Sequence, residues 1–125
     1  MLNQSGIAKA TATSPTQILA NVELQESVGC IAAQALGTAV GAKKIAKAGT
    51  PVYIDLSNLM TPVVAGTDSK AANAVLLHDV DVTSGNANAT ALLFGFVNVN
   101  RLESDVQAKV TAGINTVGAV SFVKA

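Results

Sequence analysis

The run Ala91–Val99 (ALLFGFVNV) is the most hydrophobic predicted strand of the sequence. Upstream, Ala74–Val82 (AVLLHDVDV) ends in alternating apolar and acidic residues, a pattern that indicates a half-buried strand. Between them, Thr83–Thr90 (TSGNANAT) has the composition of a loop. The two runs therefore predict an antiparallel hairpin. Gly95, between two phenylalanines, predicts a bulge or a close backbone approach.

One helix is predicted near the C-terminus, over Arg101–Ala112. Leu102, Val106 and Val110 recur every fourth residue, which places them on one helix face. The signals that support these bounds are a candidate cap, acidic residues in the first turn, a basic residue near the end and a terminating glycine: Asn100, Glu103, Asp105, Lys109 and Gly113. A final strand is expected over Ile114–Val123.

The middle of the chain also favours strands. Val28–Leu36 is apolar, and its short length leaves strand and helix both open. Ile45–Leu56 predicts a strand, a turn and a second strand, and Val63 and Val64 fit a further short strand. We expect a mainly β, β-rich α+β domain over residues 28–125.

This domain must be built from small side chains. Of 125 residues, 22 are Ala and 16 are Val, whereas only four are aromatic. Small side chains contribute little transfer free energy each, so a monomer would be modestly stable. Because charged residues make up only 13% of the chain, we infer that part of its surface meets other protein subunits.

Charge and cysteine content exclude several classes of protein. The eight basic and eight acidic side chains cancel, which argues against a basic nucleic-acid binder and against overall disorder. A single cysteine, Cys30, excludes a disulfide scaffold or a zinc module, and its apolar setting predicts a buried, inert thiol. No membrane-spanning run and no signal peptide are evident, so synthesis in the cytoplasm is expected.

Residues 1–27 differ from the rest of the chain. They are small and polar with scattered apolar groups, and we interpret them as an extended arm that becomes ordered on a partner. The apolar residues expected to make that contact are Ile7, Ile18, Leu19 and Leu24. A frayed tail, or an arm that packs on its own domain, remains an alternative.

Residues able to perform chemistry are few. His78 is the one histidine, and on a strand its side chain would point away from those of Asp79 and Asp81, which argues against a metal site. Lys43, Lys44 and Lys47 form a small basic cluster without aromatic neighbours, which favours a solvated loop edge. We expect no enzyme activity, no catalytic or metal-binding residues, no cofactor and no small-molecule substrate.

Two segments resemble a known family. They are AGTPVYIDL (Ala48–Leu56) and VLLHDVDVTSGNANATALLFGFVNVNRL (Val75–Leu102), and they are similar to the head decoration and head-fibre base proteins of tailed bacteriophages. The arm over Ser5–Val22 is also similar, so the resemblance covers nearly the whole chain. Ala74 departs from the family pattern, which has glycine there.

The resemblance implies a virion protein on the outer surface of a phage capsid, made in the host bacterial cytoplasm. It implies a compact β-tulip-like domain with one late helix, homotrimers seated on the major capsid protein, and an N-terminal arm that binds the shell. No nucleic acid or membrane partner is implied. The alternatives are the base domain of a head fibre and a small cytosolic β-rich binding module.

The trimer interface is expected among the bulkiest apolar residues. The candidates are Val80, Val82, Phe94 and Phe96. The same residues could instead fill the core of a single subunit, and the sequence leaves both interpretations open.

Overall fold

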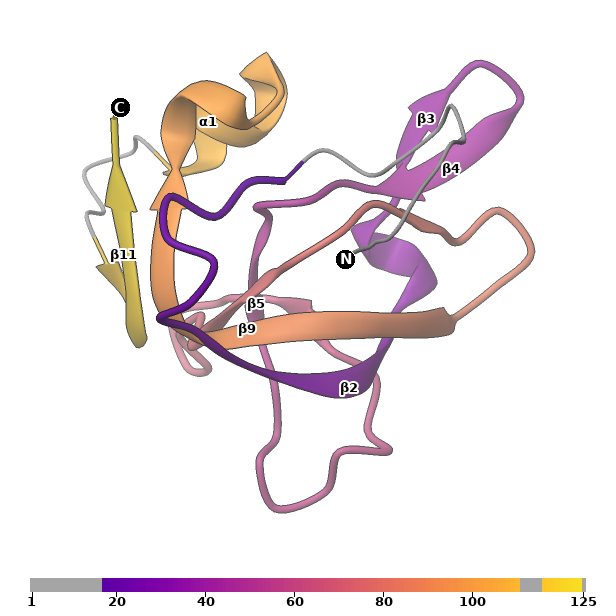
Figure 1. The fold of residues 1–125 in the computed structure, drawn as a ribbon. Coiled ribbons are helices and arrows are strands. Elements are labelled where there is room, and N and C mark those ends of the chain that lie inside the picture. Colours follow the sequence, from indigo (N-terminus) through magenta and orange to yellow (C-terminus); the bar gives the residue numbers. More distant parts are fainter. Residues whose placement is uncertain (1–16, 111–115, 125) are drawn as a thin grey trace, which may run out of the picture.

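The computed structural model describes residues 17–110 and 116–124 (Figure 1). Within them the chain is mainly β with one short α-helix, which confirms the predicted fold class. The elements follow in the order β2 (Glu26–Ala32), the 3-10 helix η2 (Gln34–Leu36), β3 (Thr38–Val40), β4 (Lys43–Ala46), β5 (Pro51–Tyr53), β6 (Val64–Ala65), β7 (Ala74–Leu76), β8 (Val80–Asp81), β9 (Ala87–Asn98), the 3-10 helix η3 (Val99–Arg101), α1 (Ser104–Val110), β10 (Thr116–Val117) and β11 (Ala119–Val123).

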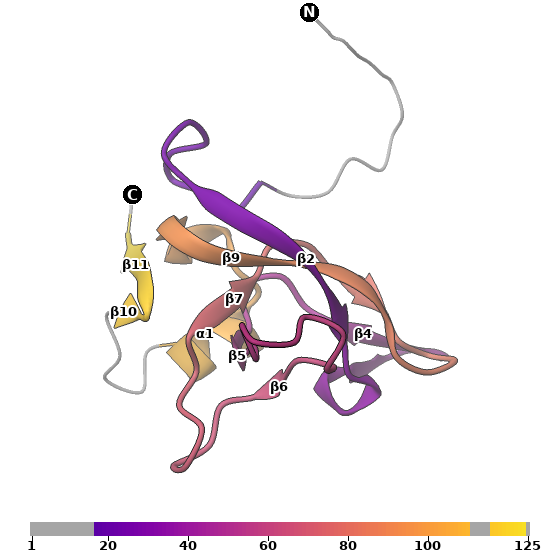
Figure 2. The same cartoon turned by 90° about the horizontal axis from the view of Figure 1, so that it is seen from below.

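The 12-residue strand β9 is the centre of the larger sheet. Leu92 is paired with Ser27 of β2 on one side and with Val75 of β7 on the other. Further along, Phe94 is paired with Glu26 of β2 and, in parallel, with Ala119 of β11. One edge of β9 is therefore followed by β2, and the opposite edge by β7 and then β11 (Figure 2).

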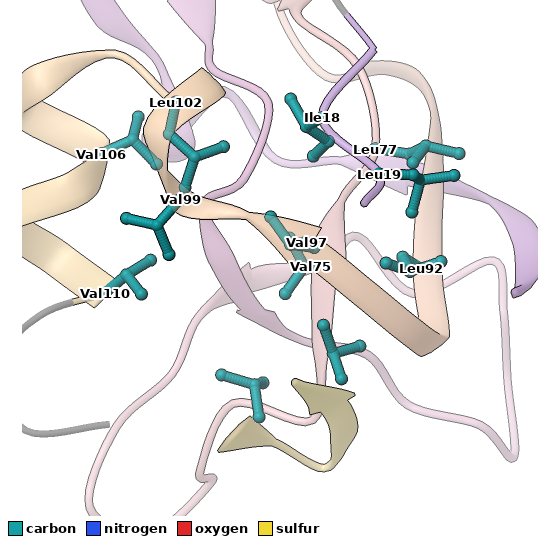
Figure 3. Packing of buried hydrophobic residues seen from close by; sticks show 12 residues of the cluster. Ile18, Leu19, Val75, Leu77, Leu92, Val97, Val99, Leu102, Val106 and Val110 are labelled. Atoms are coloured by element: carbon teal, nitrogen blue, oxygen red, sulfur yellow. The ribbon is translucent and has the colours of Figure 1, made fainter. Parts of the chain in front are cut away.

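The buried side chains form two clusters on opposite faces of this sheet. Val75 belongs to the first cluster, whereas its neighbours Ala74 and Leu76 belong to the second. Since successive strand residues point to opposite faces, the sheet has a core on each side. The first core packs under α1 through Val106 and Val110 (Figure 3).

A three-stranded sheet of β3, β4 and β8 adds to the second core. Ala46 of β4 and Val80 of β8 are paired and buried there. Their small side chains allow this sheet to lie close to the larger one, whose Ala32, Ala74 and Ala91 are each 0% exposed.

The N-terminal boundary predicted at residue 27 is wrong. Ile18 and Leu19 are 1% and 4% exposed, and both lie in the first core of their own chain (Figure 3). The amide of Ala20 donates to the carbonyl of Phe96, and the amide of Asn98 donates to the carbonyl of Ile18, both at 2.8 Å. The domain therefore includes residues 18–20, because the Ile18 and Leu19 side chains are buried in its core and this backbone is hydrogen-bonded to β9.

The helix begins later than predicted. Val99–Arg101 forms η3, which is capped by Asn98, whose side chain accepts a hydrogen bond from the Asn100 amide. α1 then begins at Ser104, and its predicted end over residues 111–112 lies outside the described residues. The predicted apolar face is confirmed, since Leu102, Val106 and Val110 are all buried.

The predicted strand Ala74–Val82 is split in two. β7 pairs with β9, as the predicted hairpin requires, but β8 pairs with β4 in the smaller sheet. The chain changes sheets at His78 and Asp79, where the Asp79 carboxylate accepts a hydrogen bond from the Ala48 amide at 2.8 Å. A backbone partner distant in sequence therefore overrides the local alternation.

The remaining predicted strands differ from the observed elements mainly in their bounds. Val28–Leu36 divides into the end of β2 and η2, and Ile45–Leu56 contains strand, turn and strand as predicted. The short strand predicted at Val63 and Val64 is Val64–Ala65. The final strand is the hairpin of β10 and β11, and residues 114–115 of the predicted range lie outside the described residues.

An ion-pair cluster fastens α1 to the turn between β4 and β5. Lys47 Nζ lies 3.1 Å from a Glu103 carboxylate oxygen and 3.0 Å from one of Asp105, and the Lys47 side chain is only 13% exposed. The hydrogen bond from Lys47 lowers the pKa of Asp105, and the same hydrogen bond raises the pKa of Lys47. One of the three lysines of the predicted basic cluster is therefore neutralised within the fold.

Replacement of Ile18 by alanine tests the corrected domain boundary. Because Ile18 is fully buried, Ile18→Ala is expected to lower the free energy of unfolding by roughly 2–5 kcal/mol, measured by urea denaturation. Val22→Ala is the matched control, since Val22 is 54% exposed and nearby in sequence. Equal, small effects of the two substitutions would restore the extended-arm interpretation of residues 18–27.

Replacement of Lys47 by methionine tests the ion pairs. Because the folded pKa of Asp105 is lowered, its contribution to stability is present above the unfolded value of 3.8 and is lost as pH falls through the folded pKa. Lys47→Met should lower the melting temperature at neutral pH, and the difference from wild type should shrink below pH 3.8. Lys43→Met, at an exposed lysine, is the control. A difference that is constant with pH would contradict the ion-pair role.

Candidate assembly surface

The most exposed aromatic side chain lies on β9. Phe94 is 41% exposed and meets Phe96 edge-on, with ring centroids 6.5 Å apart and an interplanar angle of 66°. The two rings project from the same face of the strand, because they are two residues apart. This sheet face continues that of the second core, but the smaller sheet does not reach it, so Phe94 remains open to solvent.

Strand β11 extends this surface with small side chains. In its parallel register Ala119 is opposite Phe94, and Ser121 is opposite Phe96. Val123 follows on the same face and is partly exposed. We call the surface of Phe94, Phe96, Ala119, Ser121 and Val123 the aromatic face. Exposed Glu26 of β2, which is paired with Phe94, is the charged neighbour at the rim of this face.

A tight backbone crossing supports the aromatic face from behind. Gly95 has φ +150°, and a β-carbon there would lie 3.3 Å from Cβ of Gln25 and 3.4 Å from the carbonyl oxygen of Leu24. The pairing with β2 also shifts by one residue between Glu26 and Ser27. The close backbone approach predicted at Gly95 is therefore present, whereas the irregularity in the pairing falls two residues earlier, at Leu93.

The predicted interface residues divide into two pairs. Phe94 and Phe96 reach the surface, but Val80 and Val82 are 9% and 0% exposed and belong to the second core. The prediction that Val80 and Val82 form an interface is wrong, since the smaller sheet encloses them. The two valines alternate with Asp79 and Asp81 because the valine side chains are buried in the domain and the aspartate side chains are exposed.

The predicted arm residues are also separated. Ile18 and Leu19 are internal, whereas Leu24 is 49% exposed in the loop before β2. Ile7 lies outside the described residues. Of the arm residues within the described ranges, Leu24 alone is available for contact with another molecule.

A second exposed apolar group was not predicted from the sequence. The loop between β5 and β6 exposes Leu56, Leu59 and Met60 by 62%, 38% and 74%. Two consecutive turns give this loop a defined shape, with the Asn58 amide donating to the Asp55 carbonyl and the Thr61 amide donating to the Asn58 carbonyl, both at 3.1 Å. The spacing of Asp55 and Asn58, both turn-forming residues, is the signal that could have revealed it.

This loop borders a hollow beside β2. The hollow has a volume of about 280 Å³. We call it the edge hollow, and its lining includes Gly29, Ile31, Leu59, Met60, Asn88 and Ala89. It therefore lies where an apolar loop meets the outermost strand of the larger sheet.

The titratable residues make local structural contacts. Asp79 accepts the Ala48 amide, and Asp81 accepts the Thr83 amide at 2.9 Å, a hydrogen bond that lowers the pKa of Asp81. Nδ1 of His78 is buried without a hydrogen-bond partner among the described residues. Across residues 17–110 and 116–124, no three His, Cys, Asp or Glu side chains are grouped so that they could share a metal ion.

Cys30 is a buried free thiol, as predicted. Its side chain lies in the second core at 7% exposure, and burial raises its pKa above the usual value. A thiol with a raised pKa is mostly protonated at neutral pH and reacts slowly as a nucleophile. The sequence-based interpretation of Cys30 as a packing residue is confirmed.

The comparisons with known proteins leave the residues and their geometry as the basis for function. No protein-family model matches the chain, and no curated protein matches it either. Among the helices that the structure describes, none has the length and apolar character needed to cross a membrane.

Proposed function

We propose that this protein is a virion structural protein that decorates the outer surface of a tailed-phage head as a homotrimer. The observation that carries the proposal is the aromatic face, on which Phe94 stays 41% exposed at the centre of the main sheet. A chain with only four aromatic residues places two of them on one surface, at whose rim Glu26 lies beside Phe94. Such a surface is the kind that a second copy of the chain covers in a stable oligomer.

The position of the N-terminal segment supports contact with a shell. Residues 18–20 are fixed against Phe96 and Asn98, so the described part of the N-terminal segment lies beside the strand that carries the aromatic face. Three such segments on one trimer would bind together, and their effective concentration would convert weak single contacts into firm attachment. The sequence resemblance to head decoration proteins points to the capsid as the surface that they bind.

Phe94→Ser tests the homotrimer. Wild-type protein is expected to have three times the chain mass of 12.6 kDa in light scattering after size exclusion. Phe94→Ser should weaken the trimer by roughly 10- to 100-fold in dissociation constant, because a central aromatic residue is lost. Leu56→Ser is the matched control, since Leu56 is exposed but lies outside the aromatic face. This interface would be excluded if the wild-type protein were a monomer at all concentrations, or if Phe94→Ser left the dissociation constant of the trimer unchanged.

Deletion of residues 1–16 tests attachment to the shell. The truncated protein keeps Ile18 and Leu19, so its far-UV circular dichroism spectrum should match that of the folded full chain. It is expected to lose co-sedimentation with expanded heads of a tailed phage prepared without this protein, whereas the full chain sediments with them. If truncated and full-length chains bind equally, the assignment of the shell contact to residues 1–16 is wrong.

A further inference from the structure

The outer side of β2 is a partly open sheet edge. It is paired only near its end, where the Val63 amide donates to the Ile31 carbonyl at 2.7 Å and the Ala33 amide donates to the Val63 carbonyl at 3.1 Å. Because N–H and C=O groups alternate along a strand, those of Gly29 and Ser27 face the same side as those of Ile31. Among the described residues, no further segment pairs with this side of β2.

The adjoining loop keeps the edge open instead of covering it. The segment that contains Val63 runs parallel to β2, and Pro62 just before it has no amide hydrogen to donate. The turn at Asn58–Thr61 precedes this pairing, and none of its residues pairs with β2. Leu59 and Met60 stand beside the unpaired stretch and line the edge hollow.

Gly29 points to a close approach from outside the domain. A β-carbon at Gly29 would meet no atom within 4 Å, so the packing of this chain does not require glycine there. Glycine inside a strand lowers stability, and it often marks a site where another backbone comes near. The glycine, the free backbone groups and the hollow together describe an acceptor for an extended peptide.

The N-terminal residues of the sequence match this acceptor. Ala8, Ala10 and Ala12 alternate with Lys9, Thr11 and Thr13, which is the period of a strand with one small apolar face. Lys9 is the one charged side chain in residues 1–16. An acidic group, exposed Glu26, lies at the start of the open edge.

The path of the chain favours a neighbouring copy as the source. Ile18–Ala20 runs antiparallel to β9, with Ile18 bonded to Asn98 and Ala20 bonded to Phe96. Ile18, near the first described residue, therefore lies at the Asn98 end of β9, whereas Gly29 is opposite Thr90. Eight residues of strand separate Thr90 from Asn98, or about 26 Å, and the chain would have to reverse to return to its own edge.

We propose that, in the free protein, residues 7–13 of a neighbouring copy add as a strand to the open edge of β2, with their side chains in the edge hollow. The inference rests on the homotrimer of the proposed function and deepens it, because exchanged segments would interlock the copies. Binding to a head would transfer this segment from the edge to the shell.

Amide hydrogen exchange of the full-length protein, followed by NMR, tests the inference. At concentrations where the protein is oligomeric, the amides of Gly29 and Ile31 should exchange at least about tenfold more slowly than an unstructured peptide. Dilution below the dissociation concentration should remove this protection. Unprotected amides in the concentrated wild-type protein would overturn the inference, and protection that survives dilution would overturn the assignment to a neighbouring copy.

Two matched pairs of variants identify the occupant. Ala10→Pro, which cannot donate within an added strand, should abolish the protection, whereas Gln4→Pro outside residues 7–13 should not. Met60→Asp in the edge hollow should abolish it, whereas Leu56→Asp outside the hollow should not. Since these side chains are exposed or belong to residues 1–16, unchanged far-UV circular dichroism spectra will show that the fold is intact. Protection that persists in Ala10→Pro would mean that another segment covers the edge.

The same samples separate this inference from the proposed function. If Ala10→Pro abolishes protection but the wild-type protein does not bind phage heads, the strand exchange is supported and the capsid role is excluded. If heads are bound but Gly29 and Ile31 are never protected, the capsid role stands and the exchange fails.

Discussion

Hydrogen bonding along both edges of β9 is the constraint on which the rest of the structure depends. Leu92 and Phe94 each have a paired residue on both sides, and the strands β2, β7 and β11 all pair directly with β9. The faces of the sheet are equally used, since Ala91 and Leu92 enter different cores. A chain rich in Ala and Val can satisfy this arrangement because small side chains let strands and layers approach closely.

The two candidate surfaces lie where the chain does not cover its own side chains or pair its own backbone groups. Phe94 belongs to neither core and is 41% exposed, and the loop between β5 and β6 pairs with β2 only through Val63. In both places the domain leaves apolar side chains or backbone groups that its own chain does not use. An uncovered aromatic patch and an unpaired edge are liabilities for a free monomer, so their presence together favours a protein that works within an assembly.

Local pattern predicted the elements better than their partners. The apolar face of α1, the strand character of β9 and the turn before β5 follow from spacing and residue type, and all are present. The pairing of β8 with β4 and the parallel pairing of β11 with β9 depend on residues distant in sequence, about which local alternation carries no information. Ile18 and Leu19 were misassigned for the same reason, because their partners are some 80 residues away along the chain. For the candidate surface, residue bulk indicated Phe94 and Phe96 correctly, but it could not separate them from the enclosed Val80 and Val82.

The parallel pairing of β11 has a consequence for biosynthesis. Residues 18–20 and β11 occupy opposite edges of the same half of β9, so the first and last described segments of the domain meet on one strand. A nascent chain therefore exposes at least one unpaired edge of β9 until its C-terminal strand has been made, and such long-range pairings form slowly. The half of β9 that holds residues 18–20 is therefore completed along its other edge only when β11 has been made.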